Sequence, residues 1–107
     1  MDDYIIIYCT VPSDEVAERI AEDLVHGKCA ACVNIIPGIT SVYTWKGSVC
    51  RENELLLVIK TRESLYAAVR DRIMAFHPYE VPEIVSLNIA DGNQAYLQWI
   101  TDTTNPE

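Results

Sequence analysis

The sequence predicts an α+β fold in which two helices cover one face of a four-stranded sheet. Four stretches are rich in β-branched and aromatic residues, and two others carry apolar residues at helical spacing. They follow the order strand, helix, strand, strand, helix, strand, with a short helix at the end. This is the order of a ferredoxin-like βαββαβ sandwich. The length of 107 residues fits a single domain, 1-107.

The first strand is predicted at Tyr4–Thr10, where β-branched and aromatic residues form an unbroken run. Ser13 is placed to cap the helix that follows, because its side chain can accept a hydrogen bond from a backbone N–H of the first turn. Gly27 stands where this helix is expected to end. The stripe that should face the core lies at helical spacing and comprises Val16, Ile20 and Leu24.

The middle of the chain predicts a hairpin with unusually long arms. The first arm runs over Cys29–Ile36, bends at Pro37-Gly38 and resumes over Ile39–Trp45; after a turn at Lys46-Gly47 the second arm returns over Val49–Lys60. An arm of roughly 14 residues at about 3.3 Å per residue spans about 45 Å, against a radius of gyration of about 13 Å for a chain of this length. The hairpin is therefore expected to protrude.

The second half of the fold repeats the change from strand to helix. Thr61 is expected to cap a second helix, which ends at the proline-rich corner His77–Glu83. Proline pushes the residue before it out of the helical region, so the chain must leave the helix at this corner. A fourth strand is predicted at Glu83–Ala90, and a last short helix at Ala95–Ile100. The apolar stripe of the second helix comprises Leu65, Val69, Ile73 and Phe76.

Two of the predicted strands are apolar on both faces. Ile5-Ile6-Ile7 and Leu55–Ile59 show no alternation of apolar and polar residues. A sheet with helices on one face and water on the other should alternate. Neighbouring copies of the chain would cover both the second face and the hairpin arms, so the residues predict a homo-oligomer.

Composition limits the partners and the location. The formal net charge of −8 disfavours phosphate backbones and anionic membranes and favours cations, so we expect no nucleic acid and no membrane as partner. No stretch approaches the roughly 18 consecutive apolar residues of a membrane span. The acidic start Met1-Asp2-Asp3 is unlike a signal peptide, which predicts a cytoplasmic location. The four cysteines are then expected to be reduced thiols.

Catalysis is not expected. The sequence contains neither a nucleophile with a base and an orienting group nor a glycine-rich loop for phosphate. Tyr79, Glu80 and Glu83 offer acid and base groups, but carboxylates beside such a corner are usually solvated or ion-paired. Cys29 and Cys32 have the spacing of half a zinc site, but no second pair follows.

Five blocks of the sequence resemble the CutA family, the divalent-cation tolerance proteins. The resemblance covers nearly the whole chain. It implies a ferredoxin-like homotrimer in the cytoplasm, akin in architecture to the PII signalling proteins, linked to copper tolerance and able to bind copper. The blocks are Ile7-Tyr8-Cys9-Thr10-Val11-Pro12, Ala30-Ala31-Cys32-Val33-Asn34-Ile35, Ser41-Val42-Tyr43-Thr44-Trp45-Lys46-Gly47, Lys60-Thr61 and His77-Pro78-Tyr79-Glu80-Val81-Pro82-Glu83.

The resemblance also implies metal ligands. In the bacterial member with assigned ligands, these are the cysteine that ends the first strand and two adjacent histidines before Pro-Tyr. They correspond here to Cys9 and His77, while Phe76 occupies the other histidine position. A thiolate and an imidazole suit copper, or another metal such as zinc. The alternative is that Cys9 packs as a small apolar side chain and that His77 only closes the helix.

A second hypothesis is a PII-like sensor or binding module. In this hypothesis, clefts between subunits admit a small molecule. A metal role requires both Cys9 and His77, whereas a metabolite should still stabilise the protein after both are replaced. The residues that match family blocks and are expected to line these clefts are Trp45, Lys60, Tyr79 and Glu83.

Overall fold

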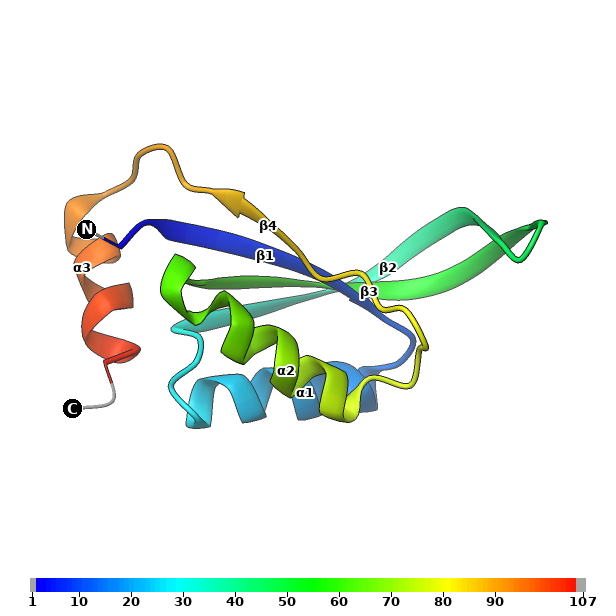
Figure 1. Ribbon diagram of the computed structural model, residues 1–107, viewed down its shortest axis with the longest axis horizontal. Coiled ribbons are helices and arrows are strands. Elements are labelled where there is room, and N and C mark those ends of the chain that lie inside the picture. Colours follow the sequence, from blue (N-terminus) through cyan, green and yellow to red (C-terminus); the bar gives the residue numbers. More distant parts are fainter. Residues whose placement is uncertain (1, 106–107) are drawn as a thin grey trace.

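The computed structural model describes residues 2–105, and their architecture is the ferredoxin-like sandwich that the sequence predicts. The elements are β1 (Tyr4–Val11), α1 (Asp14–His26), β2 (Cys32–Trp45), β3 (Ser48–Arg62), the 3-10 turn η1 (Glu63–Leu65), α2 (Tyr66–Phe76), β4 (Val85–Asn88) and α3 (Gln94–Thr103). The sheet is antiparallel with the strand order β2-β3-β1-β4, and α1 and α2 lie side by side on one face (Figure 1). None of the described helices is long and apolar enough to cross a membrane.

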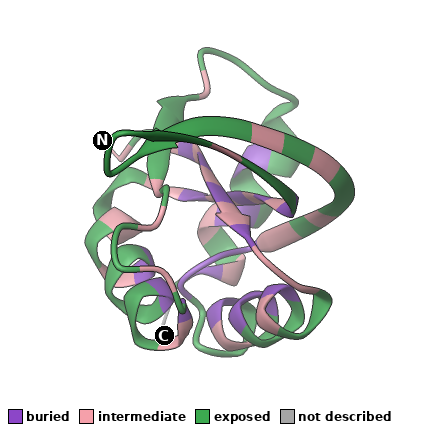
Figure 2. Ribbon diagram, turned by 90° about the vertical axis from the view of Figure 1, so that its right-hand side faces the viewer, coloured by how far each residue is buried: buried purple, intermediate pink, exposed green. Residues whose placement is uncertain are grey.

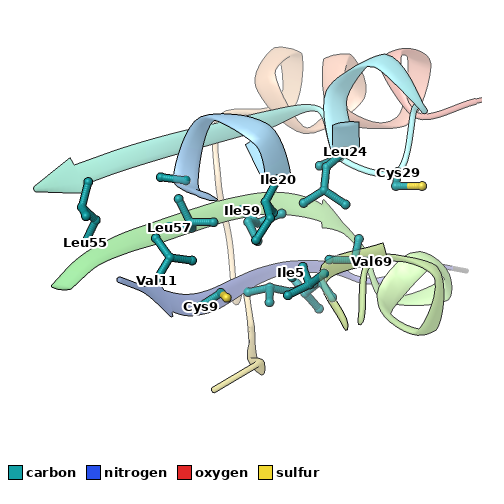
Figure 3. Close-up of a cluster of buried hydrophobic side chains, with 14 residues drawn as sticks. Ile5, Cys9, Val11, Ile20, Leu24, Cys29, Leu55, Leu57, Ile59 and Val69 are labelled. Atoms are coloured by element: carbon teal, nitrogen blue, oxygen red, sulfur yellow. The ribbon is translucent and has the colours of Figure 1, made fainter. Parts of the chain in front are cut away.

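Alternation along β1 decides which side chains enter the core. Ile5, Ile7 and Cys9 are buried beneath the helices, whereas Ile6 and Tyr8 between them are half-buried on the opposite face. The central strand β3 alternates in the same way over its second half. The main core therefore lies between the sheet and the two helices, as Figure 3 shows.

Helix α1 begins and ends as predicted. The Ser13 hydroxyl accepts a hydrogen bond of 3.3 Å from the backbone N–H of Val16, which satisfies one of the free donors of the first turn. At the other end the backbone N–H of Gly27 donates to the carbonyl of Asp23 at 2.9 Å. The buried face of the helix consists of Ala17, Ile20, Ala21 and Leu24.

The hairpin protrudes beyond the helices, as predicted (Figure 1). Strands β2 and β3 pair along the whole hairpin except for a register shift between Ile36 and Ile39, at the predicted bend. At the tip, Lys46 and Gly47 have positive φ angles of 50° and 82°. A two-residue turn of this kind matches the twist of the flanking strands. The described chain measures 44 × 26 × 22 Å.

The sheet face opposite α1 and α2 is apolar and largely uncovered among the described residues. Val85 and Leu87 of β4 are 48% and 47% exposed, and they pair with Tyr8 and Ile6 of β1. In Figure 2 the buried residues gather between sheet and helices, whereas the hairpin is mostly exposed. Helix α3 covers only one end of the uncovered face, where the hydroxyls of Tyr4 and Thr101 share a hydrogen bond of 2.5 Å.

The capping role predicted for Thr61 is wrong. Strand β3 continues through Arg62, and η1 leads into α2, whose N-cap residue is Leu65. Thr61 is fully buried, and its hydroxyl donates a hydrogen bond of 2.6 Å to the carbonyl of Cys29. A β-branched residue suits a strand, and the buried carbonyl satisfies the hydroxyl that would otherwise cap a helix.

Two predicted strand boundaries are also wrong. Strand β2 begins at Cys32 rather than Cys29, because the backbone N–H groups of Cys29 and Ala30 donate to the carbonyl of Leu24 and continue the end of α1. Strand β4 covers only Val85–Asn88 instead of 83–90. Its ladder with β1 covers these four residues, and beyond them the backbone N–H of Ile89 donates one further hydrogen bond of 2.9 Å to the carbonyl of Tyr4.

Candidate functional site

A groove of about 660 Å³ lies between the hairpin and the segment that follows α2. One wall comes from β2 and β3, and the other from the proline-rich corner at 78–83. Its aromatic lining consists of Tyr43, Trp45 and Tyr79, and its carboxylates are Glu54, Glu80 and Glu83.

The corner is held against the end of β1 by His77. This residue ends α2 with an extended conformation (φ −75°, ψ 130°), as expected before a proline. Its Nε2 donates a hydrogen bond of 2.7 Å to the carbonyl of Thr10, and its Nδ1 accepts one of 3.2 Å from the backbone N–H of Tyr79. One ring nitrogen donates and the other accepts, so the imidazole is neutral. The ring links the end of β1 to the corner, and its hydrogen bond to the backbone N–H of Tyr79 orients that residue.

Tyr79 reaches across to the hairpin. Its hydroxyl donates a hydrogen bond of 2.7 Å to Oε2 of Glu54, a carboxylate that is only 6% exposed. Burial raises the pKa of the Tyr79 hydroxyl well above its ordinary value, and the hydrogen bond to Glu54 adds to the effect. The pair places a buried negative charge in the wall of the groove.

Cys9 and His77, the two predicted metal ligands, approach the same backbone atom. The end of β1 and the end of α2 lie at the same edge of the core, and both side chains reach the carbonyl oxygen of Thr10: the Cys9 thiol donates to it over 3.8 Å and His77 over 2.7 Å. Their donor types suit copper.

Two features of this arrangement weaken its affinity for a copper ion. Burial raises the pKa of the Cys9 thiol from its ordinary value of 9.0 to about 12, with Glu83 and Glu54 adding to the shift. Both nitrogens of His77 are already used in hydrogen bonds. A metal needs a thiolate and a free imidazole nitrogen. Within residues 2–105, moreover, no group of three His, Cys, Asp or Glu side chains is arranged to hold a metal.

The residues predicted to line a cleft are divided between two places. Trp45, Tyr79 and Glu83 line the groove together. Lys60 instead lies on the uncovered sheet face, where its Nζ donates to Asn34 and approaches the sulfur of Cys32 at 4.0 Å. One residue of the predicted set is therefore outside the groove.

Sequence reasoning did not single out two residues of the groove, Glu54 and Tyr43. The only local signal at Glu54 is a carboxylate directly before the apolar run of β3. Tyr43 lies in a family block, and its hydroxyl donates a hydrogen bond of 3.4 Å to Glu52. All four cysteines are free thiols, as expected for reduced residues.

Comparison with known proteins places the chain in a family. A family model described as "CutA1 divalent ion tolerance protein" matches residues 5–103. The divalent-cation tolerance protein CutA of Thermus thermophilus is 50% identical over 99 residues, which are 92% of this chain and 96% of that protein. Protein CutA of Homo sapiens is 45% identical over 97 residues, which are 91% of this chain but only 54% of the human protein.

Solved structures agree with this placement. The structure of the divalent cation tolerance protein from Thermus thermophilus has a TM-score of 0.93 at 49% identity, and covers 95% of this chain and 99% of that one. The structure of CutA1 from Oryza sativa has a TM-score of 0.94 at 47% identity, and covers 98% and 96% of the two chains. The chain therefore belongs to the CutA1 family of divalent ion tolerance proteins.

Proposed function

We propose that the protein acts in divalent-cation tolerance as a cytoplasmic homotrimer, and that it acts by binding rather than by catalysis. The uncovered apolar sheet face is the observation that supports assembly, because exposed apolar patches of this kind mark interaction surfaces. The net charge of −8 supports a role with cations. The four free thiols support a reducing compartment.

The mass in solution tests the trimer. Light scattering at micromolar concentration should give three times the chain mass of 12.1 kDa. Mixing the protein with a copy that carries an affinity tag, and then denaturing and refolding both, should give mixed assemblies. A mass of 12.1 kDa would contradict the proposal.

We further propose copper as the cation, bound weakly by Cys9 and His77. The donor types and their shared contact with the Thr10 carbonyl support this proposal. Binding must remove the proton of a thiol whose pKa is raised to about 12, and must displace a hydrogen bond of His77, so the affinity should be low.

Copper titration in the presence of a reductant, followed by mass detection, tests this pair. Replacing Cys9 with serine should lower copper binding, and raising the pH from about 6 to about 8 should increase the binding of the wild-type protein, since the thiol must lose its proton to bind a metal. Cys50→Ser is the matched control, because Cys50 is a half-buried thiol of the hairpin, far from β1 in the sequence. Equal copper binding by the wild type and Cys9→Ser would show that Cys9 and His77 do not form the copper site.

The groove supports a second candidate function, the binding of a small molecule. Its volume of about 660 Å³ lies in the range of roughly 300–1,000 Å³ that is usual for ligand sites. Trp45, Tyr79 and Glu83 from the predicted cleft line it. A panel of metabolites should contain one that raises the melting temperature of both the wild type and Cys9→Ser. A panel without any such compound would contradict this function.

A further inference from the structure

The groove combines negative charge with aromatic surface. Its lining includes three carboxylates and three aromatic rings, and no Lys, Arg or His side chain. The ion pairs found within residues 2–105 use other carboxylates, those of Asp2, Asp71 and Asp23. The charges of Glu80 and Glu83 are therefore not neutralised by a basic side chain of the described chain.

One carboxylate is fixed in place before any ligand arrives. Glu54 is 6% exposed and accepts the hydrogen bond from the Tyr79 hydroxyl. Because a buried charge is poorly screened by water, it acts on the groove more strongly than a charge on the open surface. Such a fixed charge attracts a cation without a cost of rearrangement.

The aromatic side of the groove already contacts a cation of the chain itself. The ammonium group of Lys46, at the hairpin tip, lies over the ring of Trp45 at 5.6 Å from its centroid. This distance is within the roughly 6 Å at which the electron-rich face of an aromatic ring attracts a cation. In the single chain Trp45 is 41% exposed, so no other part of the described chain covers its ring completely.

Three classes of ligand fit these observations poorly. An anion would be repelled by the carboxylates. A neutral molecule would leave the aromatic faces without a cation and the carboxylates without a counter-charge. A bare metal ion needs several converging ligands, and the described residues contain no such group of three.

We infer that the groove binds a small organic ammonium ion, an inference that rests on the groove-binding function proposed above. The ammonium group lies against the faces of Trp45 and Tyr79, where cation–π attraction holds it, and Glu54 and Glu83 supply the counter-charge. The tethered ammonium of Lys46 competes with the ligand for Trp45.

Titration calorimetry with choline tests the ligand class. The comparison compound is the uncharged isostere of choline, in which a tert-butyl group replaces the trimethylammonium group. The two have the same shape, so a difference reports the charge. Choline should bind about tenfold more tightly or better, as expected from cation–π attraction in a partly desolvated site. Equal affinity for the two compounds would overturn the inference.

Matched variants locate the binding. Trp45→Leu should weaken choline binding about tenfold, whereas Trp99→Leu should not, because Trp99 is 43% exposed but lies in α3 outside the groove. Glu83→Gln should weaken it as well. Its control is Glu18→Gln, which removes the same charge from an exposed position of α1.

Lys46→Met gives the sharpest result, because the two possible outcomes have opposite signs. Removing the competing ammonium should tighten choline binding severalfold; weaker binding would overturn the inference. A panel in which only anions or neutral compounds raise the melting temperature would also overturn it, while leaving the groove-binding function intact. A panel in which no compound raises the melting temperature would contradict both the groove-binding function and the inference about its ligand. Light scattering on the same samples tests the trimer separately.

Discussion

The hydroxyl of Tyr79 donates a hydrogen bond of 2.7 Å to Oε2 of Glu54 and so joins the proline-rich corner to the hairpin. The two residues are 25 positions apart in the sequence. Because Glu54 is only 6% exposed, its carboxylate depends on this partner for much of its stabilisation. The contact also fixes the two walls of the groove relative to each other.

Tyr79→Phe should therefore destabilise the protein. The ring remains, but a buried carboxylate loses its hydrogen-bond donor, which should lower the free energy of unfolding by about 1–3 kcal/mol. Urea unfolding at neutral pH and fixed chain concentration measures the change. Tyr43→Phe is the control, since its hydroxyl makes only an exposed contact of 3.4 Å to Glu52. Equal effects of the two variants would show that burial of Glu54 does not matter.

Thr61→Val should destabilise the protein although the two side chains have nearly the same shape. The substitution leaves the carbonyl of Cys29 without the hydroxyl that now donates to it at 2.6 Å inside the core. The expected loss is about 1–3 kcal/mol in the free energy of unfolding. Thr44→Val, on the exposed hairpin, should change it by about 0.5 kcal/mol or less. A neutral Thr61→Val would mean that water or a rearranged backbone replaces the bond.

The Cys9 thiol should make the protein less stable at high pH. Its pKa is raised from 9.0 to about 12 in the folded chain, so the unfolded chain loses this proton first. The stabilisation is complete below pH 9.0 and is lost as the pH rises from there towards 12, with a slope of at most about 1.4 kcal/mol per pH unit.

Comparison of Cys9→Ala with wild type measures this slope. Urea midpoints between about pH 8 and about pH 10.5 should fall more steeply in the wild type than in the variant. Cys50→Ala should keep the wild-type slope, because Cys50 is only half-buried, on the hairpin. Parallel pH profiles of wild type and Cys9→Ala would contradict the burial of this thiol.

Val58→Glu should prevent assembly without unfolding the chain. Val58 lies on the central strand β3, opposite Tyr8, and its side chain shares the uncovered face rather than the core. A carboxylate buried there in an assembly would lose its hydration, which costs several kcal/mol even though Lys60 lies on the same face. Light scattering should give the mass of one chain, while circular dichroism keeps the folded spectrum. Met74→Glu is the control on α2, on the other side of the sheet, where Met74 is 50% exposed. A surviving assembly would place the interface elsewhere.

The sequence by itself determined the order of the elements and the shape of the hairpin. These features depend on short-range signals: the cap at Ser13, the bend at Pro37-Gly38 and the turn at Lys46-Gly47 all act on neighbouring residues. The apolar second face of the sheet was also predictable, because side-chain direction alternates along any strand.

Tertiary structure decided where ambiguous residues belong. Thr61 has the sequence signature of a helix cap, yet the carbonyl of Cys29, distant in the chain, accepts its hydroxyl and the strand continues. Because the strand continues, Lys60, the residue before Thr61, points to the opposite face of the sheet. Lys60 is therefore separated from the groove. A cap and a buried strand position use the same residue type, so only the strand register distinguishes them.

The same holds for the chemistry of the site. The sequence places Cys9 at a strand end and His77 at a helix end, and the structure brings them to one carbonyl. Only the fold shows that the thiol is buried and that both imidazole nitrogens are used, and only the fold brings Glu54 under Tyr79. Protonation and hydrogen bonding depend on groups that arrive from elsewhere in the chain, because burial and charge act through space and not along the sequence.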